Sequence, residues 1–148
     1  MTTDTAEFKF QRKFTISPDQ LWHLVTDPSM RGRWNSPSDD MTMTLVCSDL
    51  RAGGLERHRC GPEAAPEFEV ETKWYWLDAP TNAAFTETVE AGGASVATSL
   101  VTYRITALDS GSELHVNVAV SSFCGPEAPM EFSAGWDTAL AKLEVLAK

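Results

Sequence analysis

The chain has 148 residues, enough for one domain with a sizeable core, and its hydrophobic and charged fractions of 43% and 22% are ordinary for a globular protein. Its net charge of -9, from 21 acidic and 12 basic residues, would repel nucleic-acid phosphates and anionic lipid, so neither is an expected partner. The start of the chain lacks the features of a signal peptide, and no apolar run approaches the ~20 residues that span a bilayer. We therefore expect a cytoplasmic protein without a membrane segment.

Metal and cofactor motifs are missing from the sequence. Cys47, Cys60 and Cys124 are too widely spaced for a zinc or redox motif, so we expect reduced, structural thiols. The double glycines lack the lysine and the following helix of a phosphate-binding loop, and no His-Glu-x-x-His pair is present. We therefore expect no metal and no cofactor.

The amino-terminal part predicts a tail, a strand and a helix. Residues 1–6 are expected to be disordered, and residues 7–148 to form a single domain. Apolar and charged side chains alternate over residues 7–16, which predicts a strand. Ser17 can cap a helix, and Gln20 stands three residues later, as a capping box requires.

Six further strands are predicted between Met41 and Phe123. The first helix ends at Thr26-Asp27-Pro28, and residues 29–34 can form only a short second helical turn. The six strands are expected at residues 41–47, 55–60, 66–77, 83–90, 96–108 and 113–123. Because turns of Gly, Pro, Asn and Asp join them, we expect an antiparallel meander.

A long helix is predicted from about Pro126 to the end of the chain. Its apolar stripe has helical spacing and consists of Phe132, Trp136, Ala139, Leu140, Leu143, Leu146 and Ala147. Gly135 lies inside this helix at a cost of about 1 kcal/mol relative to Ala, which suggests a close approach of backbone or ligand. A curved sheet that receives its long helix last predicts an α+β fold built around a cavity.

Four segments in this order resemble the bacterial homologues of the activator of heat-shock-protein ATPase. They are Phe14 to Trp34, which holds Phe-Thr-Ile-Ser-Pro, Leu-Trp, Thr-Asp-Pro and Arg-Trp, then Asp49-Leu-Arg-Ala-Gly-Gly54, Ala79-Pro80, and Gly135-Trp136 with Leu140 and Leu143. The resemblance implies the START-like, or SRPBCC, helix-grip fold: six or seven antiparallel strands around the last helix, two short helices after the first strand, and a hydrophobic cavity. The superfamily spans lipid transfer, polyketide cyclisation and hormone binding, so the resemblance implies architecture more than activity.

The resemblance also makes the strand after Gly54 informative. Glu56 and His58 occupy positions from which the family sends large apolar side chains inward, which would place two ionisable groups in the pocket. The alternative is that Leu55 and Arg57 define the opposite phase, or that a bulge resets the strand.

Two further polar residues lie on apolar strand faces. Glu87 shares its face with Phe85, and an acid there needs a partner, either Arg12 of the first strand or a ligand; a bulge is the remaining alternative. Tyr103 is in phase with apolar neighbours, so its ring is expected inside, either as core or with its hydroxyl facing the pocket.

The preferred hypothesis is the binding of a small, largely apolar or aromatic ligand. The aromatic and methionine side chains can form either core or pocket wall. The expected ligand-binding residues are Trp34, Met43, Glu56, His58, Trp74, Trp76, Phe85, Glu87, Tyr103, Phe132 and Trp136.

Two alternatives remain open. A cyclase- or aromatase-like enzyme resembling the polyketide-processing relatives would use His58 or Glu87 as general base and Tyr103 as hydrogen-bond donor to an oxyanion. A protein-interaction module resembling the co-chaperones is the third class. Exposed strand edges also favour a homodimer.

Overall fold

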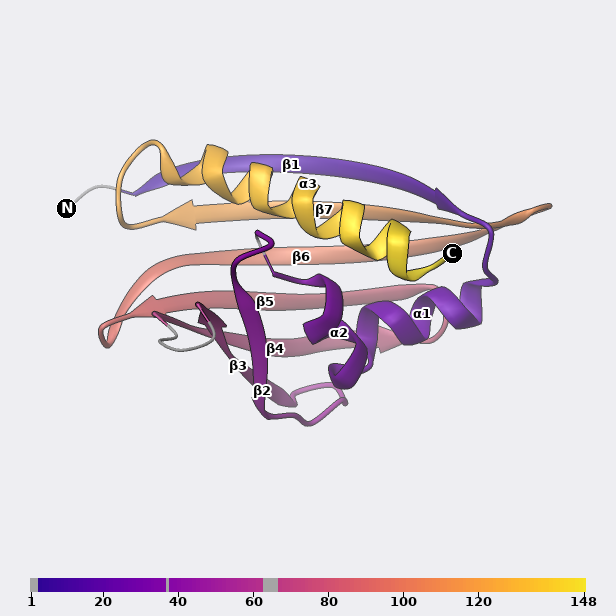
Figure 1. Ribbon diagram of the computed structural model, residues 1–148, viewed down its shortest axis with the longest axis horizontal. Coiled ribbons are helices and arrows are strands. Elements are labelled where there is room, and N and C mark those ends of the chain that lie inside the picture. Colours follow the sequence, from indigo (N-terminus) through magenta and orange to yellow (C-terminus); the bar gives the residue numbers. More distant parts are fainter. Residues whose placement is uncertain (1–2, 37, 63–66) are drawn as a thin grey trace.

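The computed structural model describes residues 3–36, 38–62 and 67–148. Within these ranges the chain forms seven strands in one antiparallel sheet and three helices (Figure 1). In chain order they are β1 (Asp4–Phe14), α1 (Pro18–Thr26), α2 (Pro28–Trp34), β2 (Thr42–Cys47), β3 (Leu55–Gly61), β4 (Phe68–Asp78), β5 (Asn82–Ala91), β6 (Ala94–Leu108), β7 (Gly111–Ser122) and α3 (Ala128–Leu146).

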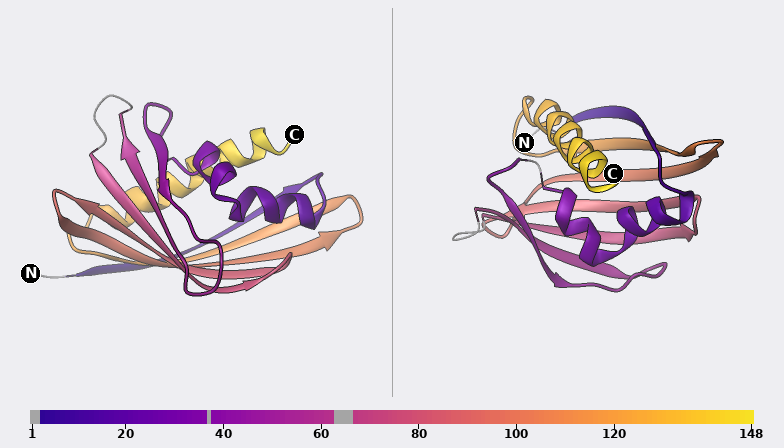
Figure 2. Two further views of the ribbon diagram at one scale, coloured as in Figure 1. Left: turned by 90° about the horizontal axis from the view of Figure 1, so that it is seen from below. Right: turned by 45° about the vertical axis from the view of Figure 1, so that its right-hand side comes forward.

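The sheet has the strand order β1-β7-β6-β5-β4-β3-β2, so every pair except β1–β7 joins neighbours in sequence. Figure 2 shows all the helices on one face of this curved sheet, with α3 on one side and α1 and α2 on the other. Side chains alternate between a buried concave face and a more exposed convex face along β6 and β7. The predicted α+β helix-grip fold, with two short helices between the first two strands, is confirmed.

Local contacts explain where the helices begin and how they are held. The Ser17 side chain accepts a hydrogen bond from the Gln20 amide, and the Gln20 side chain accepts one from the Ser17 amide, which confirms the capping box. The indole Nε1 of Trp34 donates to the Leu24 carbonyl at 2.8 Å and ties α2 to α1. Lys142 of α3 donates to Ser36 Oγ at 2.7 Å, which ties α3 to the segment after α2.

The first strand begins earlier than expected. Residues 4–6 were predicted to be disordered, but they form the start of β1, where Asp4 pairs with Ser122 and Ala6 with Val120. The prediction failed because residues 4–6 are too few to show a clear alternation of apolar and polar side chains. In the structure, β7 supplies pairing partners for the whole length of β1. Residues 1 and 2 of the predicted tail lie outside the described residues, as does residue 66, the predicted start of β4.

A β-bulge in β4 overturns one predicted site residue. Trp74 pairs with Phe85 and Trp76 with Ala84, which are consecutive on β5, so Tyr75 is an extra residue that has no partner on β5. The bulge reverses the alternation, and Trp76 is 59% exposed whereas Trp74 is fully buried. Trp76 therefore lies outside the interior in which the sequence placed it.

The remaining features of the fold concern the sheet edges, the helix lengths and the cysteines. In the described part of the chain β1 and β2 are the edge strands, so the expected homodimer stays a prediction. None of the described helices is both long and apolar enough to cross a membrane. The three cysteines are free thiols, with Cys60 buried and Cys47 and Cys124 exposed.

Candidate functional site

The sheet register brings four polar side chains into one row across the concave face. Glu56 of β3 lies opposite Thr72 of β4, Thr72 opposite Glu87 of β5, and Glu87 opposite Ser99 of β6. Glu56 and Thr72 are fully buried, and Ser99 is 5% exposed. We call these four residues the polar row. Apolar residues flank the row on β4, β5 and β6, so the polar row divides the interior into two halves.

The packed half lies on one side of the polar row, towards α1 and α2. Its floor includes the cross-strand pairs Trp74–Phe85 and Ala83–Tyr103, in adjacent rows of the concave face. The Trp74 and Phe85 ring centroids are 4.9 Å apart, and those of Phe85 and Tyr103 are 5.1 Å apart. These three aromatic side chains are 0% exposed, so none of them is accessible from solvent.

Arg31 of α2 lies at the centre of the packed half with its side chain completely buried. Its Nε donates to Glu56 Oε2 at 2.9 Å, and its Nη1 donates to the Val25 carbonyl at 3.2 Å and to the Tyr103 hydroxyl at 3.4 Å. The guanidinium carbon lies 5.0 Å from the centre of the Phe85 ring, within range of a cation–π contact. Arg31 therefore neutralises the buried Glu56 carboxylate.

The charges around Arg31 set the protonation of its neighbours. Although burial alone would lower the pKa of Arg31, Tyr103, Glu56 and Glu87 together raise it, so the guanidinium stays charged. Burial raises the pKa of Tyr103 to about 12, with Arg31 acting in the opposite direction, so the hydroxyl stays protonated. Burial also lowers the pKa of His58 below 6.5, which favours a neutral imidazole.

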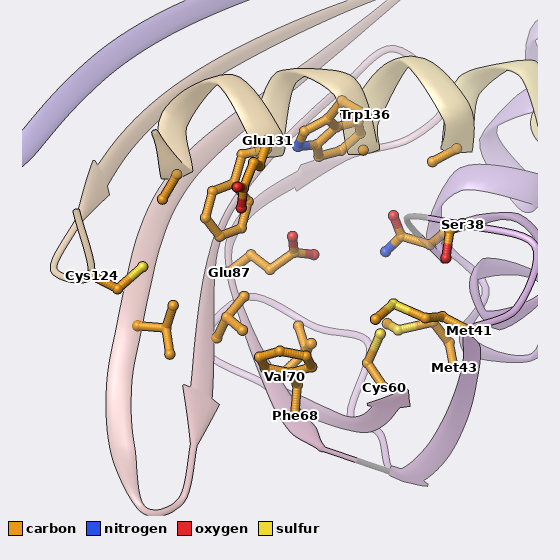
Figure 3. A pocket seen from close by; sticks show the side chains of 17 residues that line it. Ser38, Met41, Met43, Cys60, Phe68, Val70, Glu87, Cys124, Glu131 and Trp136 are labelled. Carbon is orange, nitrogen blue, oxygen red and sulfur yellow. The ribbon is translucent and has the colours of Figure 1, made fainter. Parts of the chain in front are cut away.

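A pocket of about 420 Å³ occupies the other half, beneath the first turns of α3 (Figure 3). Its walls are mainly apolar and include Met41, Met43, Phe68, Val70, Phe132 and Trp136. Cys124 and Glu131, which also line it, are exposed and mark its mouth. We call this side of the polar row the pocket half.

Glu87 is the member of the polar row that lines the pocket. Figure 3 shows its carboxyl group projecting into the space between Trp136 of α3 and Met43 of β2. Its side chain is 15% exposed, and its Oε2 lies 4.0 Å from Arg31 Nη2, too far for a hydrogen bond. Burial raises the pKa of Glu87, while Arg31 and the nearby Asn35 amide lower it and Glu56 raises it further.

The polar row and its neighbours contain several buried polar atoms without a hydrogen bond to any described residue. They include Arg31 Nη2, Glu56 Oε1, Thr72 Oγ1, Glu87 Oε2 and both ring nitrogens of His58. Such atoms are rare in folded proteins, because an unpaired buried group loses its hydration without replacement. Their concentration at the border between the two halves sets this place apart from the ordinary core.

The predicted site residues divide between the two halves. Those that line the pocket are Met43, Glu87, Phe132 and Trp136. Those that are buried without lining it are Trp34, Glu56, His58, Trp74, Phe85 and Tyr103. Glu56 and His58 do point inward, as the family-like phase predicted, but both are buried among other side chains and neither lines the pocket.

The proposed partnership of Glu87 with Arg12 is wrong. Arg12 instead contacts α3, with Nη2 2.7 Å from Asp137 and Nε 3.1 Å from Glu144. β1 and β5 are separated in the sheet by β7 and β6, which keeps the two residues apart.

Sequence reasoning missed Arg31. The available signal was its position three residues before Trp34, which puts both on one face of α2, together with the need of Glu56 and Glu87 for a counter-charge. It also missed Cys60, which lines the pocket and whose thiol pKa is raised first by burial and then by Glu87. A thiol with a raised pKa is a weak nucleophile.

Metal chemistry has no support in the described residues, since none of their His, Cys, Asp and Glu side chains form a group of three or more that could hold an ion. Within the pocket, Glu87 is the candidate for acid–base chemistry, because Tyr103 and His58 are buried and do not line the space. The arrangement can therefore bind an apolar body and present the carboxyl group of Glu87 to it, with Glu131 at the mouth.

Comparisons with known proteins agree with the architecture. The model of the family described as Activator of Hsp90 ATPase homolog 1-like protein matches residues 15–148. Among curated proteins no match was found.

Solved structures of bacterial proteins share the fold. One from Rhizobium loti has a TM-score of 0.84 at 21% identity, over 98% of this chain and 99% of that chain. One from Chromobacterium violaceum has a TM-score of 0.81 at 17% identity, over 95% and 96% of the two chains. The AHSA1 protein of Silicibacter pomeroyi has a TM-score of 0.78 at 19% identity, again over 95% and 96%.

The structural likenesses establish the fold, and the family match covers the chain from the end of β1 to its last residue. The helix-grip architecture, the capped first helix and the pocket beneath the last helix agree with this match. The chain therefore belongs to the family of Activator of Hsp90 ATPase homolog 1-like proteins, within the SRPBCC superfamily.

Proposed function

We propose that this chain binds a small, largely apolar molecule in the pocket beneath α3. The observation that carries the proposal is the pocket itself, about 420 Å³ of space with mainly apolar walls in a domain whose other half is closely packed. Ligand sites in proteins typically have volumes of about 300–1,000 Å³ and a few polar groups in an apolar lining. The family fold supports the same function, because it commonly encloses hydrophobic ligands.

The walls and the polar row have separate roles in this proposal. Phe68, Val70, Phe132 and Trp136 remove the apolar body of the ligand from water, at about 25 cal/mol per Å² of buried apolar surface before ordering costs. Glu87 orients the ligand, because its largely enclosed carboxyl group projects into the middle of the space.

The test uses a neutral fluorescent apolar probe, N-phenylnaphthylamine, with two variants of β5. Val89 lines the pocket, so Val89→Phe should fill part of the space and weaken probe binding at least about tenfold, equal to 1.4 kcal/mol. Thr86 alternates with Glu87 and so lies on the opposite face of β5, and Thr86→Phe is the matched control that should leave binding unchanged.

Equal loss of binding in both variants, or none in either, would contradict the proposal. Native mass spectrometry of the protein purified from its source then identifies the natural ligand as a recurrent bound mass. A natural ligand that still copurifies with Val89→Phe in full would likewise place the site elsewhere.

Catalysis of the cyclase type is a second candidate, favoured by one observation. A carboxyl group with a raised pKa that faces an apolar pocket is suited to general base or acid catalysis. His58 and Tyr103 do not line the pocket, so Glu87 would act without the oxyanion donor first expected. Incubation with a poly-β-ketone thioester, followed by mass analysis, tests this: product from the wild type and none from Glu87→Gln supports catalysis. A co-chaperone role stays a prediction.

A further inference from the structure

We propose that the ligand carries a protonated amine, which pairs with Glu87 while its apolar body fills the pocket. This inference rests on the proposed ligand-binding function and deepens it by naming the head group. It is carried by the charge of the pocket lining, the position of Glu87, whose nearby cation Arg31 is already hydrogen-bonded to Glu56, and the aromatic walls.

The charged residues of the pocket lining all have one sign. Glu87 projects into its middle and Glu131 lies at its mouth. Among the described residues that line it there is no Lys, Arg or His. A carboxylate or phosphate head group would therefore meet two carboxyl groups of like charge and no cation among the lining residues, whereas an ammonium group would be attracted by both. The Lys142 ammonium behind the lining residue Ser38 is already hydrogen-bonded to Ser36 and Ser38.

The nearest cation does not balance Glu87. Arg31 donates to Glu56 Oε2 at 2.9 Å but lies 4.0 Å from Glu87 Oε2, without a hydrogen bond. The group of Arg31, Glu56 and ionised Glu87 therefore holds one surplus negative charge, because neutral His58 contributes none. A cation in the pocket would neutralise this surplus and favour the ionised form of Glu87, against the burial that raises its pKa.

The apolar part of the lining also suits an ammonium group. Phe68, Phe132 and Trp136 provide aromatic rings, whose faces attract cations, and Met41 and Met43 provide polarizable thioethers. The chain as a whole has a net charge of -9, which raises the local concentration of small cations. Aromatic cages are a recurring solution for binding quaternary ammonium ions in proteins.

The test compares three probes that share one body and differ only in the head group: phenylbutylamine, phenylbutanol and phenylbutyrate. Binding is measured at neutral pH by calorimetry on the full chain. We expect the amine to bind about tenfold more tightly than the alcohol, because it alone gains the charge pairing, and the carboxylate to bind most weakly. Raising the salt concentration should reduce the advantage of the amine.

Two variants of β5 assign the preference to a residue. Glu87→Gln keeps the shape of the side chain but removes its charge, so the amine and the alcohol should then bind within about twofold of each other. Glu90, on the same strand, does not line this pocket, so Glu90→Gln should keep the full preference. Thermal unfolding of both variants checks that the fold is retained.

The outcomes separate the two proposals. If the three probes bind equally, or the carboxylate binds best, the amine preference is overturned while ligand binding stands. If Glu87→Gln keeps the preference for the amine over the alcohol, another residue recognises the head group and the inference fails. If none of the three binds at millimolar concentration and the neutral fluorescent probe also fails, both proposals fall together.

Discussion

The packed half and the pocket half lie on the same concave face of one sheet, yet they are filled in opposite ways. In the packed half, Arg31 and Glu56 are enclosed by Trp74, Phe85 and Tyr103, all of them 0% exposed. In the pocket half, apolar walls of similar composition surround about 420 Å³ of space. Buried polar side chains are therefore no guide to the site by themselves, because Arg31, Glu56 and Tyr103 lie in the closed half and do not line the pocket.

Glu87 is where the two halves meet. One side of its carboxyl group faces Arg31, and the group as a whole lines the pocket. A ligand that binds Glu87 therefore acts on the charge balance of the packed half as well. Four experiments test this division, and the one with the largest expected effect comes first.

The largest loss is expected from Arg31→Met. The change keeps bulk but leaves Glu56 buried without a cation, which should lower the free energy of unfolding by about 3–5 kcal/mol. Urea unfolding at neutral pH measures it. The double variant Arg31→Met/Glu56→Gln should recover part of the loss, and Arg51→Met, at an exposed residue, should change stability by less than about 0.5 kcal/mol. A loss that the double variant does not reduce would show that charge pairing is not the cause.

A matched pair of phenylalanines compares the halves directly. Phe85→Ala in the packed half should lower the free energy of unfolding by about 3–5 kcal/mol, because it leaves a cavity among close neighbours. Phe132→Ala in the pocket wall should cost about 1 kcal/mol, because that ring already borders open space. Chemical denaturation measures both. Equal losses would mean that the pocket half is as tightly packed as the other.

The third effect is a dependence of stability on pH. The folded-state pKa of Glu87 is raised above 4.5, so its stabilising contribution is full below that pH and is lost as the pH rises through the folded value. Glu87→Gln should therefore gain stability relative to the wild type across that window, with a slope of at most about 1.4 kcal/mol per pH unit.

The pH series has internal controls. Arg31, Glu56, Tyr103 and His58 face Glu87 or its immediate neighbours, and they are present in both proteins. The lowered pKa of His58 acts with the opposite sign, since it adds stability as the pH rises towards 6.5, and it cancels in the comparison. A flat difference between Glu87→Gln and the wild type would argue against a raised pKa of Glu87.

The smallest effect is expected at Trp76. Because the bulge leaves this side chain 59% exposed, Trp76→Gln should change the free energy of unfolding by less than about 0.5 kcal/mol. Binding of the fluorescent probe should also be unchanged. Loss of probe binding in this variant would show that Trp76 contributes to the binding site after all.

The fold followed from local signals. The capping box at Ser17, the alternation along each strand and the change to helical spacing after Pro126 are properties of neighbouring residues, so they predicted the elements and their order. Antiparallel pairing followed from the short connections. The bulge at Tyr75 did not, because Trp74 and Trp76 both fit an unbroken apolar alternation.

The division of the site could not be predicted in this way. Whether Glu56 meets a ligand or Arg31 depends on where α2, 25 residues earlier in the chain, crosses the sheet. Gly32 allows that close approach, since a Cβ atom there would lie 3.2 Å from the Met43 carbonyl oxygen. The polar row was visible only as isolated exceptions on apolar strands until the register aligned them.

The pairing of β1 with β7 means that the first strand to be synthesised must wait for its partner strand. A ribosome completes β1 first and reaches β7 only after the rest of the sheet, an interval on the order of ten seconds at typical rates of synthesis. During that interval the apolar side chains of β1, Phe8, Phe10 and Phe14, have no strand beside them. The pocket forms later still, because α3 supplies its cover. A nascent chain stalled before Ala128 would thus expose the floor of the binding site to the cell before it could hold any ligand.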